Sequence, residues 1–156
     1  MKPIEIYTDG ACQGNPGRGG WSCIVYDKEA NALKYAMEGE EEDWTLTETT
    51  NNRMEIHGLL HALYLATTWY SNDVCIIYCD SSYCVNMFNE WIFSWERNDW
   101  KRSKNQEILN LDLIKEYWNL YQQGYRIDLR KIKGHAGHPG NELADALATG
   151  KIKGDE

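Results

Sequence analysis

Four acidic residues of this chain have local contexts that could aim their carboxylates at one shared point. They occur in the segments Thr8-Asp9-Gly10, Asn52-Arg53-Met54-Glu55, Cys79-Asp80-Ser81 and Asn141-Glu142-Leu143-Ala144-Asp145. Carboxylates gathered in one place repel one another, and the simplest physical reason to gather them is to hold hard divalent cations. The four acids therefore predict a metal-dependent phosphodiester hydrolase.

Each acid also has an ordinary structural explanation. Asp9 with the following glycine is a turn dipeptide, and Asp80 could cap a helix that follows it. Glu55, three residues after Asn52, resembles the acid of a capping box. Asp145 could be a solvated helix residue. The metal hypothesis therefore depends on whether the fold brings the four carboxylates together.

The first half of the chain has the patterns of a sheet followed by a helix. Alternating residues predict strands over 4–8, 20–28 and about 32–42, which would form an antiparallel meander. A helical period then runs from 51 to about 70. Its apolar stripe consists of Met54, Leu59, Ala62, Leu63 and Ala66. Residues 74–79 are a continuous apolar run, which is typical of a strand buried on both faces.

The second half mixes helices with one more strand. The predicted elements are short helical pieces over 82–95, a helix over 106–123, a strand over 125–133 and a helix over 141–148. This order predicts a mixed sheet with helices packed on it, an α/β architecture. Asp9 and Asp80 each follow a predicted strand. If those strands are parallel neighbours, the two carboxylates come within metal-bridging distance.

Length and composition indicate one globular domain. The chain has 156 residues, of which 42% are apolar, and we expect a domain over 1–150 with a short tail over 151–156. No apolar run approaches the ~20 residues that span a bilayer. The N-terminal residues lack the apolar core of a signal peptide. We therefore expect a cytoplasmic protein without a membrane partner.

The cysteines indicate reduced thiols. Their number is odd, and they are Cys12, Cys23, Cys75, Cys79 and Cys84. Thiols in a buried strand behave as small hydrophobic groups. A zinc site built from Cys75, Cys79 and Cys84 is an alternative, but their spacing matches no paired-cysteine pattern.

The net charge of −8 argues only weakly against a polyanionic substrate. Residues 27–48 hold eight acids and two bases, a local charge of −6, so the remainder carries −2. A basic strand lies near the C-terminus. Its cations are Arg126, Arg130, Lys131 and Lys133. A local patch of this kind is compatible with nucleic-acid binding.

Four longer motifs surround the acids. They are TDGACQGNPG at 8–17, TTNNRME at 49–55, DSSYCV at 80–85 and KGHAGHPGNE at 133–142, with Asp145 after the last. Their order and spacing, over about residues 4–148, resemble those of ribonuclease H in its bacterial type 1 form. The resemblance implies a ribonuclease H-like fold, a five-stranded mixed sheet with an antiparallel meander, parallel strands and helices on both faces.

The resemblance also implies an activity and the residues that carry it. The expected reaction is endonucleolytic hydrolysis of the RNA strand of an RNA–DNA hybrid with two Mg²⁺ ions, or Mn²⁺ in their place, giving 5′-phosphate and 3′-hydroxyl ends. The implied metal-binding and catalytic acids are Asp9, Glu55, Asp80 and Asp145. His135 would assist proton transfer or product release, and Glu142 matches an acid near the second ion.

Further residues are expected to hold the hybrid. By resemblance, Asn15, Asn51 and Ser82 would lie near the minor groove, where the family often has glutamine at the position of Ser82. Thr50 and Asn51 would bind a phosphate of the DNA strand at a helix N-terminus. The segment that resembles the family's basic protrusion contributes Trp91, Trp95, Lys101 and Arg102. The two tryptophans could instead pack on the core as one helix face.

Three other functions compete with this hypothesis. A non-catalytic module that binds RNA–DNA hybrids would use the same surface without cutting. The nuclease portion of a reverse transcriptase, or an integrase relative, would share part of the pattern. His57 and His61 have the spacing of a metalloprotease helix, but Gly58 stands where that motif needs glutamate. We expect a monomer with no obligate protein partner.

Overall fold

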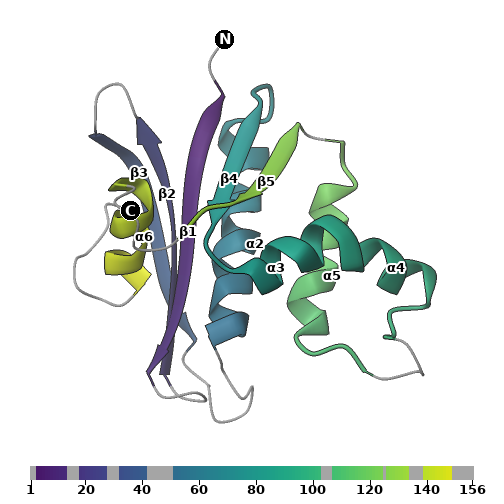
Figure 1. Cartoon of the computed structure of the whole chain (residues 1–156). Helices are drawn as coiled ribbons and strands as arrows, with labels where there is room; N and C mark the ends of the chain where they lie inside the picture. Colours follow the sequence, from purple (N-terminus) through teal and green to yellow (C-terminus); the bar gives the residue numbers. More distant parts are fainter. Residues whose placement is uncertain are drawn as a thin grey trace.

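A computed structural model describes residues 3–13, 18–27, 32–41, 51–102, 107–124, 126–133 and 139–148 of the chain. Five strands form one sheet in the order β3-β2-β1-β4-β5 (Figure 1). Their bounds are β1 Ile4–Gln13, β2 Arg18–Asp27, β3 Ala32–Glu41, β4 Cys75–Cys79 and β5 Ile127–Lys131. The first three strands pair antiparallel, whereas β4 pairs parallel with both β1 and β5. The predicted mixed sheet is confirmed.

The first strand is longer than predicted. β1 continues through Asp9 and Gly10 to Gln13, because β2 pairs with it along this whole stretch. On its other edge, β1 pairs with β4 only from Ile4 to Tyr7. The same register places Asp80 beside Asp9, where β4 ends. The turn expected at Asp9 is therefore wrong, but the parallel neighbours that the metal hypothesis required are present.

Helices cover both faces of the sheet (Figure 1). Their bounds are α2 Asn51–Trp69, α3 Ser82–Asn86, a π-helical turn η1 Met87–Trp91, α4 Ile92–Arg97, α5 Leu111–Tyr121 and α6 Pro139–Ala148. The α3–η1–α4 segment extends past α5 and away from the sheet (Figure 1). Within the described parts of the chain, no helix combines the length and apolar character needed to cross a membrane.

Strand alternation divides the apolar side chains between two cores. Ile6 and Val25 face the larger core, which α2, α3 and α5 cover. Tyr7 and Ile24, each one residue away, face a smaller core closed by Ala144 of α6. The predicted apolar stripe of α2 is confirmed, since all five of its residues are at most 2% exposed. This alternation presents α2 and α6 to opposite faces of β1.

Two helix starts differ from the sequence-based prediction. α5 begins at Leu111 rather than near 106, and the residue before it, Asn110, has a left-handed backbone with φ of 61°. α6 begins at Pro139, two residues earlier than predicted. Proline suits the first helical position, because an amide N–H there has no helical partner.

Candidate active site

Asp9 lies in the middle of the sheet. The residue is only 4% exposed. The neighbouring Gly10 makes this position possible, because a Cβ atom on Gly10 would lie 2.2 Å from the carbonyl carbon of Met54 in α2. The missing side chain therefore allows the first turns of α2 to pack directly on β1. That contact brings Glu55 beside Asp9.

Glu55 projects from α2 toward the same point and is 8% exposed. It shares a hydrogen bond with Asp9. The thiol of Cys79, the last residue of β4, donates to Glu55 Oε2 at 3.7 Å. The backbone amide of Gly10 also bonds to the Glu55 carboxylate. Groups from β1 and β4 thus converge on this side chain of α2.

Asp80 follows β4 directly and is half-buried. The buried side chain of Asn141, from α6, has its Nδ2 at 3.5 Å from Asp80 Oδ2. The adjacent Ser81 is the N-cap of α3, where its hydroxyl accepts from the amide of Cys84 at 3.2 Å. Asp80 is therefore not the helix cap that its sequence context also allowed. Its carboxylate points into the acid cluster.

Asp145 completes the cluster from α6, where it is half-buried and hydrogen-bonded to Asp9. The hydroxyl of Ser22, the β2 residue paired with Asp9, donates to the carbonyl of Ala144. This bond ties α6 to the sheet one residue before Asp145. The alternative that Asp145 is a solvated helix residue is therefore wrong. The capping box suggested for Asn52 and Glu55 is also wrong, because Asn52 lies inside α2 rather than before it.

The electrostatics of the cluster are those of like charges held out of water. Burial is the main cause that raises the pKa of Asp9 to about 7. The hydrogen bond between Asp9 and Glu55 lowers this pKa, whereas the charge of Asp80 and the hydrogen bond from Asp9 to Asp145 raise it further. Burial and the charge of Asp9 raise the pKa of Glu55 well above its usual range. The buried pair therefore binds protons more tightly than free carboxylic acids do when no cation compensates its charge.

The donor atoms fit a divalent cation. Carboxylate oxygens from four separate elements are the ligands that Mg²⁺ prefers, and the raised pKa values of Asp9 and Glu55 show that the protein itself leaves their charge uncompensated. Glu55, Cys79 and Asp80 alone, among the described residues, form a group of three or more candidate ligands within 4.8 Å of one another. The alternative zinc site of Cys75, Cys79 and Cys84 is therefore not formed. These cysteines are buried free thiols.

Comparison with known proteins agrees with this geometry. A sequence model of the RNase H family matches residues 1–153. The chain belongs to the ribonuclease H family. It is 41% identical to a ribonuclease H of Alcanivorax borkumensis over 150 residues, which are 95% of this chain and 90% of the relative.

Solved structures share the fold of this ribonuclease H family member. LC9-RNase H1, a type 1 RNase H, has a TM-score of 0.77 and 26% identity, covering 99% of this chain and 76% of its own. LC11-RNase H1, solved in complex with an RNA/DNA hybrid, has a TM-score of 0.66 and 21% identity, covering 94% of each chain. The expected ribonuclease H-like fold is thereby confirmed.

The ribonuclease H substrate residues that we predicted are only partly within the described structure. Asn15, Thr50 and His135 lie outside the described residues. Asn51, at the start of α2, and Ser82, at the start of α3, are exposed, as are Lys101 and Arg102. Glu142 is exposed in the first turn of α6.

The two tryptophans of the protruding segment differ in exposure. Trp91 is 37% exposed, with its ring 5.5 Å from that of Tyr83 and 6.1 Å from that of Trp95. Trp95 is half-buried and packs against the main core. Trp95 therefore supports the protrusion, whereas Trp91 also offers a surface to a ligand.

The histidine pair of α2 has a structural explanation. The ring of His61 stacks on Trp21 with centroids 3.8 Å apart, and its Nδ1 lies 2.7 Å from the carbonyl oxygen of His57. A Cβ atom on Gly58 would lie 2.9 Å from the carbonyl oxygen of Asp9. Gly58 thus serves the close packing of α2 on β1, which explains why the protease motif is not completed.

Three contacts of the ribonuclease H site were not anticipated from the sequence. They are the thiol of Cys79 on Glu55, the amide of Asn141 on Asp80 and the hydroxyl of Ser22 on α6. Cys79 and Asn141 lie in the segments that carry Asp80 and Asp145, and this proximity is the only feature of the sequence that could have indicated their roles. Ser22 has none, because its role depends on its pairing with Asp9 across the sheet.

Proposed function

We propose that this ribonuclease H cleaves the RNA strand of RNA–DNA hybrids endonucleolytically, with Asp9, Glu55, Asp80 and Asp145 as ligands of two Mg²⁺ ions. Mn²⁺ is the alternative ion. The observation that carries the proposal is the convergence of the four carboxylates in a member of this family. The products would be a 5′-phosphate and a 3′-hydroxyl. The enzyme would act as a cytosolic monomer.

The side chains divide into ligands and groups that orient them. Two bound Mg²⁺ ions would supply electrostatic stabilisation to the attacking water and to the leaving oxygen on either side of the phosphorus. The amide of Asn141 limits the rotation of the Asp80 carboxylate, and the thiol of Cys79 does the same for Glu55. Such outer contacts fix the directions in which the ligand oxygens point. His135 would hold or release a proton as the product leaves.

The exposed residues would bind the hybrid without reading its bases. Asn51 lies at the start of α2, where backbone amides suit a phosphate of the DNA strand. Ser82 and Asn15 would contact the minor groove, where the 2′-hydroxyl distinguishes RNA from DNA. Lys101 and Arg102 are exposed cations that suit the backbone of the DNA strand, and Trp91, in the same protruding segment, is an exposed ring on which a base or sugar could pack.

The deciding experiment is cleavage of an end-labelled RNA–DNA hybrid in Mg²⁺, beside duplex RNA, duplex DNA and single-stranded RNA. We expect cleavage of the RNA strand of the hybrid alone. Asp80→Asn should reduce kcat by at least about 10²-fold, the loss typical of removing one group that stabilises developing charge. Hybrid binding should remain.

The matched control is Asp128→Asn, which removes an exposed carboxylate that pairs with Arg130 at 2.7 Å on β5. This variant should cut at the wild-type rate. Binding of the hybrid without cleavage by the wild-type protein would instead support the alternative hybrid-binding module.

A further inference from the structure

A rigid turn presents the two exposed cations of the protruding segment. This cationic turn comprises residues 98–102 and follows the end of α4. The side-chain amide of Asn98 donates to the carbonyl of Lys101 at 2.9 Å and to that of Arg102 at 3.4 Å. Asp99 and Trp100 have left-handed backbones, with φ of 54° and 60°. Two successive residues in this region cost conformational energy, so the bonds of Asn98 hold a defined turn.

The cationic turn and α4 are seated on α5 through aromatic contacts. The ring of Trp100 meets that of Trp118 edge to face at 5.9 Å, and Lys115 Nζ lies 5.7 Å from the centre of the Trp100 ring. Phe93 of α4 packs on Trp118 at 5.5 Å and on Tyr121 at 6.0 Å. The position of the cationic turn therefore follows that of α5.

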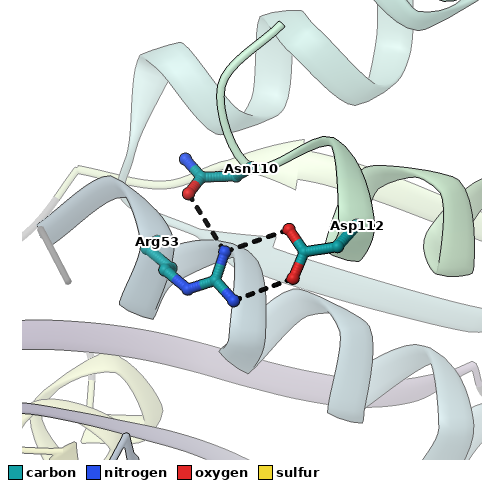
Figure 2. Close-up of polar contacts among 3 residues, drawn as sticks. All are labelled: Arg53, Asn110 and Asp112. Atoms are coloured by element: carbon teal, nitrogen blue, oxygen red, sulfur yellow. Dashed lines mark hydrogen bonds and ion pairs between the residues drawn. The ribbon is translucent and has the colours of Figure 1, made fainter. Parts of the chain in front are cut away.

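A buried arginine connects α5 to the helix that carries Glu55. Figure 2 shows the guanidinium of Arg53 reaching from α2 to the start of α5. Its two terminal nitrogens donate to the two carboxylate oxygens of Asp112, at 3.1 and 2.9 Å, and one of them also donates to Asn110 Oδ1 at 3.2 Å. Arg53 is 7% exposed. A buried guanidinium with a two-point contact of this kind fixes both distance and angle between its partners.

Arg53 lies close in sequence to the residues that would bind metal and substrate. Arg53 lies two residues before Glu55 and two after Asn51, on the turns of α2 that would bind metal and DNA phosphate. The connection therefore runs from Glu55 along the backbone of α2 to Arg53, and from Arg53 through Asp112 and α5 to the cationic turn. We infer that the Arg53–Asp112 pair positions the cationic turn relative to the catalytic acids, and thereby sets the affinity for hybrids long enough to reach both. The inference rests on the proposed function.

Hybrid length separates this role from a purely structural one. We would measure the Kd, KM and kcat of Asp112→Asn with a hybrid of about 18 base pairs and with one of about 6 base pairs, a third of that length. For the long hybrid, Kd and KM should rise about 5- to 10-fold while kcat stays nearly unchanged, as expected when binding is weakened equally in the ground state and the transition state. The short hybrid should bind the variant and the wild type equally.

The matched control is Glu107→Gln, which removes one negative charge from an exposed residue four positions before the same helix. It should leave the affinity for both hybrids unchanged. Arg53→Lys is a second variant, because it keeps the buried charge but cannot make two parallel hydrogen bonds to one carboxylate. It should reproduce the length-dependent loss. Thermal unfolding of each variant confirms that the compared proteins are folded.

A double-mutant cycle completes the test. In a Lys101→Ala/Arg102→Ala background, Asp112→Asn should cause no further loss of affinity for the long hybrid, because the group that it positions is gone. Equal losses with long and short hybrids, or losses that add in this background, would overturn the inference. Cleavage by the wild type tests the proposed function separately, since the Kd comparison stands without turnover.

Discussion

Asp9 lies in an environment that departs clearly from that of an ordinary carboxylate. Three other acids surround it, and its pKa is raised from 3.8 to about 7 mainly by burial. A carboxyl group with a raised pKa binds its proton more tightly in the folded protein than in the unfolded chain. Its contribution to stability is therefore greatest below pH 3.8, falls as the pH rises toward 7, and stays low above that.

The direction of this pH dependence predicts how Asp9→Asn affects the stability of the metal-free protein. The asparagine cannot ionise, so the free energy of unfolding of the variant should exceed that of the wild type by an amount that grows between pH 4 and 7, reaching on the order of 1–3 kcal/mol. Urea unfolding in a chelator across this pH range measures the difference. Mg²⁺ should stabilise the wild type and have little effect on the variant. A difference that is independent of pH would contradict the prediction.

His135 supports a second prediction that concerns a single side chain. Replacing it with alanine should reduce kcat by about 10²-fold, the usual contribution of a positioned proton-transfer group, with little change in hybrid affinity. Multiple-turnover cleavage measures kcat, single-turnover cleavage measures the chemical step alone, and a binding titration measures the hybrid affinity. His138→Ala, three residues away in the same segment, is the control and should be nearly silent. An equal effect of the two variants would remove His135 from the proposed mechanism.

The central contact between elements is that of β1 with α2. It depends on two glycines, because Cβ atoms at Gly10 and Gly58 would lie 2.2 Å and 2.9 Å from backbone atoms across the contact. Backbone atoms cannot yield as the end of a flexible side chain can. The distance between Asp9 and Glu55 is therefore set by glycine packing rather than by the acids themselves.

Gly10→Ala tests this dependence. The added methyl group should push α2 away from β1, lowering the free energy of unfolding by about 1–3 kcal/mol. Because a displacement of about 1 Å in a catalytic group can cost 10²-fold in rate, cleavage should fall by about that factor. Gly124→Ala is the control. Its φ is 85° with open space around it, so it should cost about 1–2 kcal/mol of stability while the folded enzyme keeps its activity.

For the molecule as a whole, the charge distribution determines how it meets a polyanion. The net charge is −8, so attraction to a hybrid depends on local cations such as Lys101 and Arg102 at the protruding segment. Contacts of cations with phosphates weaken steeply with salt, because bound counterions are released when they form. The enzyme should therefore lose hybrid affinity strongly as the ionic strength rises.

The salt dependence gives the last prediction. KM for the hybrid should rise with salt concentration, and Lys101→Ala should reduce the magnitude of the slope of log Kd against log salt by about 1, as expected for one lost phosphate contact. Asp128→Asn changes the net charge by the same amount in the opposite direction, away from the protruding segment, and should leave the slope unchanged. A KM that hardly changes with ionic strength would refute this account of binding.

Local sequence alone determined much of this protein. The periods of α2 and β4 predicted their type and bounds closely, because each buries a face that repeats along the chain. The motifs around the four acids were enough to predict metal-dependent hydrolysis and the family. The bounds of an element were predicted less accurately where a residue distant in sequence contacts its end. Asn110 accepts a hydrogen bond from Arg53 and has a left-handed backbone, and α5 starts directly after it.

Only the tertiary structure decided how the acids meet. Their convergence depends on strand order, on the register that sets Asp80 beside Asp9, and on the glycine contacts that bring α2 onto β1. The bonds from Cys79, Asn141 and Ser22 also join residues far apart in the chain. Periodicity records which face of an element is buried, but not which element covers it. The geometry of the site is therefore a property of the packed fold.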